Sequence, residues 1–510
     1  MNFKTVHILS YLVGLFFALE PSYIHPDEHF QSMEILAHRI LGTRGTIPWE
    51  FEPEHAARSF VPLYVVYGPA FYFFRMFWGT SASSGIALMY LVRLQNYVVF
   101  TCIYKLALQF LLRSKLDRAK ANFYISTSYI AWTYQTHSFS NSMETCVLLT
   151  VLSLFQVLTL DSRNPKYNHY KTSIFMAIAI AFGLFNRITF AGFIALPALL
   201  PFYKFYMGHL RSLLVFITAF SLSCMAFIYI DTKLYGTSRW SVTPLNNLRY
   251  NLNASNLALH GIHSRYTHLF VNLPQMVGPL VIYFVAIKQK VTMPFLSCIS
   301  GLLILSLFQH QELRFLVPLM PLFCSSIDLS KYRNALVTKY VTVVWLAFNA
   351  IFGLFMGSLH QRGVITAIQN MTKEEGPVGV DIWWKTYSPP TWLYANRDLI
   401  VSTTNIEGDL ESLDLVDFTI TKDHVVDLKG CDYDLFESAI LGFLKSEPTS
   451  IRLIIPKSTN KFLTEFKNSH SEIDIQTKWE TYFNIDMDHL DFSDLSTLTP
   501  GITMYAISML

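Results

Sequence analysis

Two adjacent carboxylates, Asp27 and Glu28, lie between His25 and His29 directly after an apolar run. Carboxylates and imidazoles are the side chains that most often transfer protons in catalysis. Pro26 suits the first turn of a helix through residues 28–37, whose positive end favours ionised acids. Neighbouring residues do not share a helix face. One acid can therefore point to the reaction while the other orients a neighbouring group. The alternative is that both acids only stabilise the helix terminus.

A second polar cluster, His310-Gln-Glu312-Leu-Arg314, interrupts two long apolar runs. Each ionised group costs about 2.5–3.5 kcal/mol at the centre of a membrane helix, so the cluster is expected to line a cavity or its mouth. The guanidinium of Arg314 is a permanent cation with a donor fork suited to phosphate. The alternative is an internal ion pair between Glu312 and Arg314 that closes a loop.

Weaker signals come from an arginine between apolar runs and from a group of histidines. Arg187 follows Asn186 at a predicted span boundary, where a cation that reaches for the interface is the more common finding. His260, His263 and His268 share a polar loop, but their spacing matches no compact metal-ligand motif. A loop that packs on a sugar or phosphate, or a plain interfacial loop, is favoured over a metal site.

The composition restricts the class of protein. The chain has 510 residues, of which 52% are hydrophobic and 15% are charged. Soluble proteins carry about 25% charged residues, so the composition indicates a membrane protein. The net charge of +3 is small and its basic residues are scattered, so no nucleic-acid partner is predicted. The six cysteines show neither a disulfide framework nor zinc spacing.

Apolar segments recur along residues 1–359 and predict a polytopic, mainly α-helical membrane domain. The first run, residues 7–19, is followed by Glu20 and Pro21 rather than by the small residues of a cleavage site, so it is predicted to be an uncleaved span. At about 20 apolar residues per span, the chain predicts about ten to twelve spans. Residues 61–78 contain Pro62 and Pro69 and are predicted to form a re-entrant or interfacial element.

Basic loops set the predicted orientation. Residues 113–120, 204–211, 288–290 and 331–339 are rich in Lys and Arg and are expected in the cytoplasm. The polar loops at residues 22–60 and 231–268 then face the lumen. Glycosylation acceptor triplets begin at Asn253 and Asn370, both on that side, although such triplets also arise by chance.

The C-terminal part has a different pattern. After about residue 360 the charge rises, and β-rich runs at residues 417–422, 450–456 and 502–510 alternate with polar turns and an amphipathic run at residues 434–446. A length of about 150 residues is normal for one domain. Residues 360–510 are therefore predicted to form a small lumenal α+β domain.

Missing motifs narrow the function. The sequence has no P-loop, no Rossmann glycine fingerprint and no nucleophile elbow. Acids beside the membrane then favour an enzyme that acts on a lipid-borne substrate, over a transporter or a scaffold subunit. A transporter is expected to carry its acids within spans near the midplane, whereas Asp27 and Glu28 follow the first span.

A family resemblance rests on five segments: HPDEHFQ (residues 25–31), GTIPWEF (45–51), Arg58-Ser59, DTKLYG with TPLNNLRYN (231–251) and HQELRF (310–315). Together they resemble the mannosyltransferases of the endoplasmic reticulum that use dolichyl-phosphate mannose, glycosyltransferase family 22. The resemblance covers residues 1 to about 360 and implies the C-type membrane glycosyltransferase fold. The HPDE form is most similar to the branch that builds glycosylphosphatidylinositol (GPI) anchors.

The resemblance implies an inverting α-1,2-mannosyltransferase with a lumenal active site at the endoplasmic reticulum membrane. Asp27 is the expected base and Glu28 the residue that orients it or the acceptor. Arg314 and His310 are expected to stabilise the phosphate leaving group, a role that requires no metal. No cofactor is therefore predicted, although metal dependence stays open.

The remaining candidates are predicted contacts to substrate. They are His25, His29, Arg187, Tyr235, Asn246, His263 and Glu312. The expected partners are dolichyl-phosphate mannose, a GPI-precursor glycolipid and membrane lipid. The favoured product carries the fourth, side-branching mannose, and the alternative is addition of the third mannose.

Overall fold

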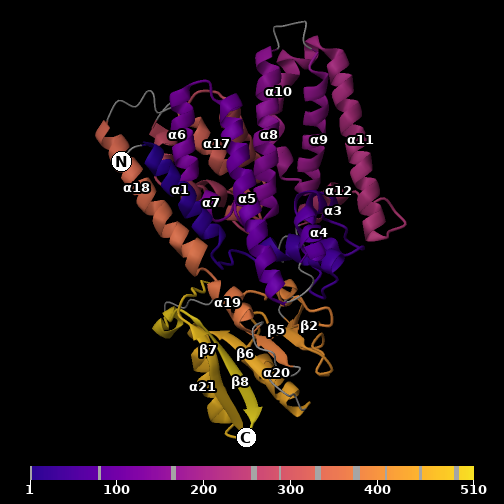
Figure 1. Cartoon of the computed structure of the whole chain (residues 1–510), viewed down its shortest axis with the longest axis vertical. Helices are drawn as coiled ribbons and strands as arrows, with labels where there is room; N and C mark the ends of the chain where they lie inside the picture. The colour runs from indigo at the N-terminus through magenta and orange to yellow at the C-terminus, as the bar shows by residue number, and fades with distance from the viewer. Residues whose placement is uncertain are drawn as a thin grey trace. The chain divides into compact units, whose positions relative to one another are not determined.

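The computed structural model of the chain describes residues 3–77, 82–161, 168–253, 261–286, 289–327, 335–371, 379–407, 410–446, 451–487 and 493–510. Two compact units are present. The helical unit comprises Met1–Ala18, Pro48–Val66 and Arg93–Gly353, and the sheet unit comprises Leu19–Ile47, Tyr67–Val92 and Leu354–Leu510 (Figure 1). The predicted acidic motif therefore belongs to the same compact unit as the C-terminal sheet.

Helices make up the helical unit (Figure 1). Their bounds are α1 Phe3–Ala18, η3 Trp49–Phe51, α3 Phe60–Val66, most of α5 Ala82–Leu111, α6 Lys115–Ser126, α7 Tyr129–Trp132, α8 Ser140–Asp161, α9 Tyr170–Asn186, α10 Phe190–Lys204, η4 Tyr206–Gly208, α11 Leu210–Tyr235, α12 Thr243–Leu252, η5 His268–Asn272, α14 Leu273–Val277, α15 Leu280–Ala286, α16 Met293–Leu305, η6 Leu313–Leu316, α17 Leu319–Ser326 and α18 Ala335–Leu354.

Within the described residues, five helical stretches are long and apolar enough to cross a membrane. They are Gly85–Leu111, Ser140–Asp161, Phe190–Gly208, Leu210–Tyr235 and Leu336–Leu359. The bent pair of α3 and α4 (Gly68–Phe77) can add a sixth, and three shorter apolar helices accompany them. This number is smaller than the predicted ten to twelve because apolar runs break into short pieces. Pro318, for example, separates η6 from the eight-residue α17.

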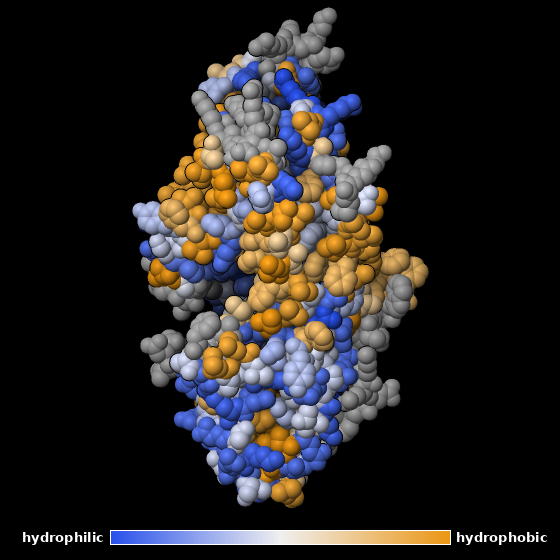
Figure 2. All heavy atoms as spheres, turned by 90° about the vertical axis from the view of Figure 1, so that its left-hand side faces the viewer, coloured by the Kyte–Doolittle hydropathy of each residue, from blue (hydrophilic) through white to orange (hydrophobic). Residues whose placement is uncertain are grey.

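Apolar side chains cover much of the surface of the helical unit, as Figure 2 shows for one face. Helices α1 and α18 expose Ile8, Leu12, Val343 and Ile351, each more than half accessible. The span window of α11 has no buried residues at all. Exposed apolar surface on this scale is unusual in a soluble monomer and is expected where helices meet lipid.

The sheet unit contains a six-stranded mixed sheet of order β2-β5-β1-β6-β8-β7. Strands β1 (Val380–Trp383), β2 (Ile400–Thr403), β5 (His424–Asp427) and β6 (Ile451–Pro456) are parallel. Strands β7 (Ile473–Thr481) and β8 (Ile502–Met509) join antiparallel. The other elements are η1 His29–Met33, α2 Glu34–Leu36, η2 Ala37–Leu41, α4, the first part of α5, η8 Phe355–Leu359, α19 Arg362–Met371, η9 Thr391–Tyr394, β3 Asn405–Glu407, β4 Leu410–Ser412, α20 Tyr433–Lys445, η10 Lys457–Thr459, α21 Asn460–Ser469 and η11 Leu495–Leu498.

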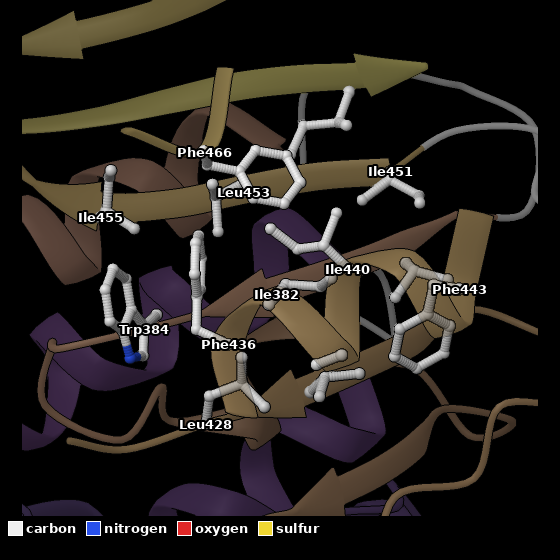
Figure 3. Packing of buried hydrophobic residues seen from close by; sticks show 14 of the residues in the cluster. Ile382, Trp384, Leu428, Phe436, Ile440, Phe443, Ile451, Leu453, Ile455 and Phe466 are labelled. Atoms are coloured by element: carbon white, nitrogen blue, oxygen red, sulfur yellow. The ribbon is translucent and has the colours of Figure 1, made fainter. Parts of the chain in front are cut away.

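The core of the sheet unit forms where α20 packs on the central strands (Figure 3). Phe436, Ile440 and Phe443 recur at helical spacing and are fully buried. The ring of Phe436 stacks on Trp384 with centroids 3.9 Å apart. The sequence predicted α20, β6 and β8 correctly, but the strand predicted at residues 417–422 is wrong. Phe418 lies in irregular backbone there and packs on Phe443 instead.

Some sequence predictions reach residues outside the described part of the chain, among them the basic loops at residues 288–290 and 331–339. The triplet beginning at Asn253 continues into residues 254–255, and the triplet beginning at Asn370 ends at residue 372. The first histidine of the loop, His260, also lies outside the described residues.

Candidate functional site

The acidic motif opens a helical segment of the sheet unit, as the sequence predicted. The carbonyl of Pro26 accepts hydrogen bonds from the backbone N–H groups of His29 (3.0 Å) and Phe30 (3.0 Å). The helix then continues through η1, α2 and η2 to Leu41. Pro26 fits this position because a first-turn residue needs no N–H donor. Asp27 and Glu28 thus sit at the helix N-terminus, where backbone dipoles favour negative charge.

The two acids are not equivalent. Glu28 is fully buried, and its Oε1 accepts a hydrogen bond from the backbone N–H of Ile24 at 3.1 Å. The side chain of Asp27 is 21% exposed and its Oδ1 lies 3.5 Å from Nδ1 of His25, which is itself 33% exposed. The accessible acid is therefore Asp27, whereas Glu28 is held inside the unit.

The second histidine of the motif is buried rather than open to a ligand. The side chain of His29 is 1% exposed, and its Nε2 lies 3.6 Å from Oε1 of Glu28. Its ring packs edge-on against Tyr23, with centroids 5.0 Å apart. On the opposite side of the ring, Nδ1 accepts a hydrogen bond from the indole N–H of Trp392 at 3.2 Å. Nδ1 of this predicted substrate contact is therefore engaged by Trp392, and Nε2 faces the carboxylate of Glu28 from beyond hydrogen-bond distance.

Sequence reasoning missed a third carboxylate in this helical segment. Glu34 is buried, and its carboxylate accepts hydrogen bonds from the hydroxyl of Thr391 and from the backbone N–H of Trp392 (3.1 Å). Gly45 of the GTIPWEF segment lies so close to Glu34 that a Cβ there would clash with Oε1 of the carboxylate. The glycine therefore permits the close approach of this backbone to the buried acid. The position of Glu34 within an apolar helical run was the available signal.

Burial raises the pKa of Glu34 to about 7, although hydrogen bonds from Thr391, Trp392 and Thr46 act in the opposite direction. Because this folded-state pKa lies above the unfolded value of 4.5, the native state holds a proton that the unfolded chain has released between these pH values. The contribution of protonated Glu34 to the free energy of unfolding is therefore fully present below about pH 4.5 and is lost as the pH rises towards 7. The full effect is on the order of 3 kcal/mol.

We expect Glu34→Gln to remove this pH dependence, because an amide does not titrate. Thermal unfolding of the purified protein in detergent at pH 5 and pH 8 measures it. The wild type should lose more stability across this range than Glu34→Gln, and the exposed Glu54→Gln variant should behave as the wild type. An equal change of thermal stability between pH 5 and pH 8 in the wild type and in Glu34→Gln would refute the raised pKa of Glu34.

In the helical unit, the HQELRF segment forms a compact charged cluster. Nε2 of His310 lies 2.9 Å from Oε1 of Glu312, and the guanidinium of Arg314 pairs with the same carboxylate. The internal ion pair considered as an alternative is therefore formed. Burial lowers the pKa of His310, but the hydrogen bond and charge of Glu312 outweigh this effect and the net pKa is raised. The cluster therefore favours a cationic His310.

Arg187 joins the same region through an aromatic ring. The ring centroid of Phe315 lies 5.3 Å from Cζ of Arg187 and 5.4 Å from Cζ of Arg314. The Arg187 side chain is only 8% exposed and its Nε lies 3.4 Å from Oε2 of Glu144, a buried acid of α8. The interpretation of Arg187 as an interfacial cation is therefore wrong, because a buried carboxylate holds its guanidinium. An acid within an apolar span was the signal that sequence reasoning missed.

A further arginine converges on this network. Nη1 of Arg58 and Nη1 of Arg187 donate to the Ser140 hydroxyl at 3.3 and 2.9 Å. Nε of Arg58 also donates to Oε1 of Glu50 at 2.9 Å. A cavity of about 40 Å³ lies beside them; its lining residues are Ala57, Arg58, Leu184, Phe185, Asn186, Arg187, Ile188, Thr189, Pro244 and Asn247. The structure thus brings together segments that are far apart in the sequence.

Two other predicted contacts hold the segment that carries Arg58. The hydroxyl of Tyr235 donates to the backbone carbonyl of Arg58, at 2.5 Å. The side-chain amide of Asn246 donates to the carbonyl of Ala56 at 3.1 Å. In the described geometry, Tyr235 and Asn246 therefore position this segment.

The third, His263, lies beside the HQELRF cluster. Its ring centroid is 6.1 Å from that of His310. The neighbouring His268 is buried, and burial together with the charges of His263 and His310 lowers the pKa of His268 to about 4. Within the described residues, no group of three or more His, Cys, Asp or Glu side chains is arranged to hold a metal ion.

Comparison with known proteins agrees with this architecture. The model of the Alg9-like mannosyltransferase family matches residues 5–396. The chain is 44% identical to GPI mannosyltransferase 4 of Eremothecium gossypii over 508 residues and 43% identical to GPI mannosyltransferase 4 of Saccharomyces cerevisiae over 521 residues. Each alignment covers 100% of both chains.

A solved structure has the same fold. The crystal structure of ArnT from Cupriavidus metallidurans bound to undecaprenyl phosphate aligns with a TM-score of 0.51 at 10% identity, over 98% of this chain and 97% of that one. The predicted C-type membrane glycosyltransferase fold is thereby confirmed. The family match extends over well more than half of the chain and includes both charged motifs. The chain therefore belongs to the Alg9-like mannosyltransferase family.

Proposed function

We propose that the chain transfers mannose from dolichyl-phosphate mannose to a GPI precursor and adds the fourth, α-1,2-linked mannose. The observation that carries this proposal is the full-length similarity to two GPI mannosyltransferases 4, at 44% and 43% identity. The chain is a membrane-embedded glycosyltransferase of a mannosyltransferase family. The proposed location is the endoplasmic reticulum membrane, with the acidic motif on the lumenal side.

The proposed reaction is a single displacement with inversion. The acceptor hydroxyl oxygen attacks C1 of mannose, the bond from C1 to the phosphate oxygen breaks, and dolichyl phosphate leaves. Asp27 takes the proton of the acceptor hydroxyl. The partial exposure of Asp27 and the complete burial of Glu28 support this division of roles, because a general base must reach its substrate.

For the leaving group, we propose His310 and Arg314 as the stabilising cations. Phosphate gains negative charge as the bond breaks, and donors that are already in place stabilise that charge without reorganisation. Arg314 is held by Glu312, and the raised pKa of His310 favours its cationic form. Both features support a preorganised cationic cluster.

A lipid site in the helical unit is also proposed. A cavity of about 310 Å³ between α5, α8 and α9 has mostly apolar walls; its lining residues are Val66, Asn96, Val99, Ile103, Gln135, Ser142, Met143, Cys146, Val147, Thr150, Phe175, Ile178, Ala179 and Phe182. An apolar cavity of this size suits part of a lipid chain. We assign it to a hydrocarbon chain of a lipid-linked substrate.

Depletion of the protein tests the proposed acceptor. We expect a GPI precursor with three mannoses to accumulate, because its extension would stop at the fourth mannose. Mass spectrometry of extracted glycolipids identifies the species. Accumulation of a two-mannose precursor would indicate the third-mannose alternative, and the absence of any accumulating glycolipid would favour a transporter or scaffold.

A further inference from the structure

The buried histidine of the acidic motif has a hydrogen-bond donor from a distant part of the sequence. The indole Nε1 of Trp392 lies 3.2 Å from Nδ1 of His29, and both side chains are buried. An indole N–H can only donate, so Nδ1 of His29 must act as the acceptor. A neutral imidazole then carries its proton on Nε2, the nitrogen that lies 3.6 Å from Oε1 of Glu28. Trp392 thus determines that the protonated nitrogen Nε2 of His29 is the one that points towards Glu28.

Trp392 is itself held in place by a separate set of contacts. Glu34 accepts a hydrogen bond from its backbone N–H at 3.1 Å and another from the hydroxyl of Thr391. The ring of Trp392 also packs against Phe71, with centroids 6.1 Å apart. Since Glu34 belongs to the helical segment that begins at Asp27, one segment carries both the acidic motif and the anchor of Trp392. The match to the family model extends to residue 396 and includes Trp392.

We propose that Trp392 is a positioning residue for mannose transfer, which acts through the tautomer and orientation of His29 on Glu28. In this arrangement the Nε2–H of His29 points at the carboxylate of Glu28, 3.6 Å away, as a charge–dipole contact longer than a hydrogen bond, and Glu28 holds the turn before Asp27 through the backbone N–H of Ile24. The inference rests on the proposed function of Asp27 and Glu28 and assigns His29 an orienting role in place of a substrate contact. A displacement of a reacting group by about 1 Å, caused by a substitution away from the chemistry, can lower the rate by about 10²-fold.

Two substitutions of Trp392 separate hydrogen bonding from packing. Trp392→Phe keeps most of the apolar volume but removes the donor. Trp392→His removes more volume, yet its Nε2 can occupy the place of the indole Nε1, because the imidazole overlays the five-membered half of the indole. We expect Trp392→Phe to lower kcat by about tenfold or more with little change in KM, and Trp392→His to retain the higher kcat.

The matched control is Trp384→Phe. The indole of Trp384 is also buried and donates a hydrogen bond to the carbonyl of Cys431 at 2.9 Å, but it belongs to the core of the sheet. We expect this control to lower thermal stability and to leave kcat unchanged. Protein abundance and thermal unfolding in detergent are measured for every variant. A higher kcat for Trp392→Phe than for Trp392→His would show that packing alone matters and would overturn the inference.

A second pair of variants covers the case in which substitutions of Trp392 fail to fold. His29→Gln can accept from the indole and donate to Glu28, whereas His29→Leu has a similar size and can do neither. We expect His29→Gln to have a higher kcat than His29→Leu, and equal kcat values of the two variants would overturn the inference.

The proposed function is tested separately by Asp27→Asn. If that variant is inactive while Trp392→Phe has a normal kcat, only the inference fails; if Asp27→Asn is fully active, the proposed site fails as well.

Discussion

Asp27→Asn is expected to lower mannose transfer by about 10²- to 10⁴-fold, the contribution that positioned acid and base groups usually make. The amide has nearly the same shape as the carboxylate and can keep contacts near His25, but it cannot take a proton. Asp27 is the accessible acid of its motif, with 21% of its side chain exposed. The loss should therefore appear in kcat rather than in folding.

Transfer of labelled mannose from dolichyl-phosphate mannose, in membranes from cells that lack the native protein, measures this effect. Immunoblotting of the same membranes checks abundance and insertion. Asp398→Asn is the matched control, because Asp398 is an exposed aspartate of the same unit whose carboxylate pairs with Lys422. Near-normal transfer by Asp27→Asn at equal abundance would reject the role of Asp27 as the base.

Arg314→Ala is expected to reduce transfer by about 10²- to 10³-fold, the cost of removing one preorganised donor to a developing negative charge. The reduction should depend on the donor more than on the acceptor, because the proposed partner of Arg314 is the phosphate of dolichyl-phosphate mannose. Loss of the guanidinium also removes one cationic partner of Glu312 and leaves its contact with His310. The site then loses positive charge where the phosphate is proposed to gain negative charge.

Kinetics with donor and acceptor varied in turn test this assignment. Arg314→Lys should recover part of the activity, since it keeps the charge but not the planar fork of donors. Arg239→Ala is the control, because Arg239 is an exposed arginine of the same unit in the loop after α11. An unchanged dependence on donor concentration in Arg314→Ala would count against contact with phosphate.

Local patterns in the sequence predicted much of the fold. The apolar run at residues 7–19 predicted helix α1, and the β-rich run at residues 502–510 predicted β8. The long apolar helices among the described residues are fewer than the predicted spans, because a break such as Pro318 divides an apolar run into short pieces. The strand expected at residues 417–422 failed for a related reason. Phe418 is partly buried against Phe443 of α20 without any strand pairing, and a short β-rich run cannot distinguish the two cases.

The sequence predicted which charged residues belong to the candidate site, but not which of them contact each other. From the sequence, Arg187 beside a span was interpreted as an interfacial cation, because its contact with Glu144 is visible only in the structure. Glu34 and Trp392 carried no local signal of their contact, since 358 positions separate them along the chain. Whether a buried charge is stabilised depends on partners that only folding supplies.

The sequence by itself determined that this is a helical membrane protein, that an acidic motif follows its first apolar run, and that it resembles the mannosyltransferases. These properties follow from composition, periodicity and short motifs, which are local. Only the tertiary structure decided that Glu28 is buried while Asp27 is accessible, and that Trp392 donates to His29. Burial and hydrogen bonding depend on which distant segments come together, and no local pattern encodes that arrangement.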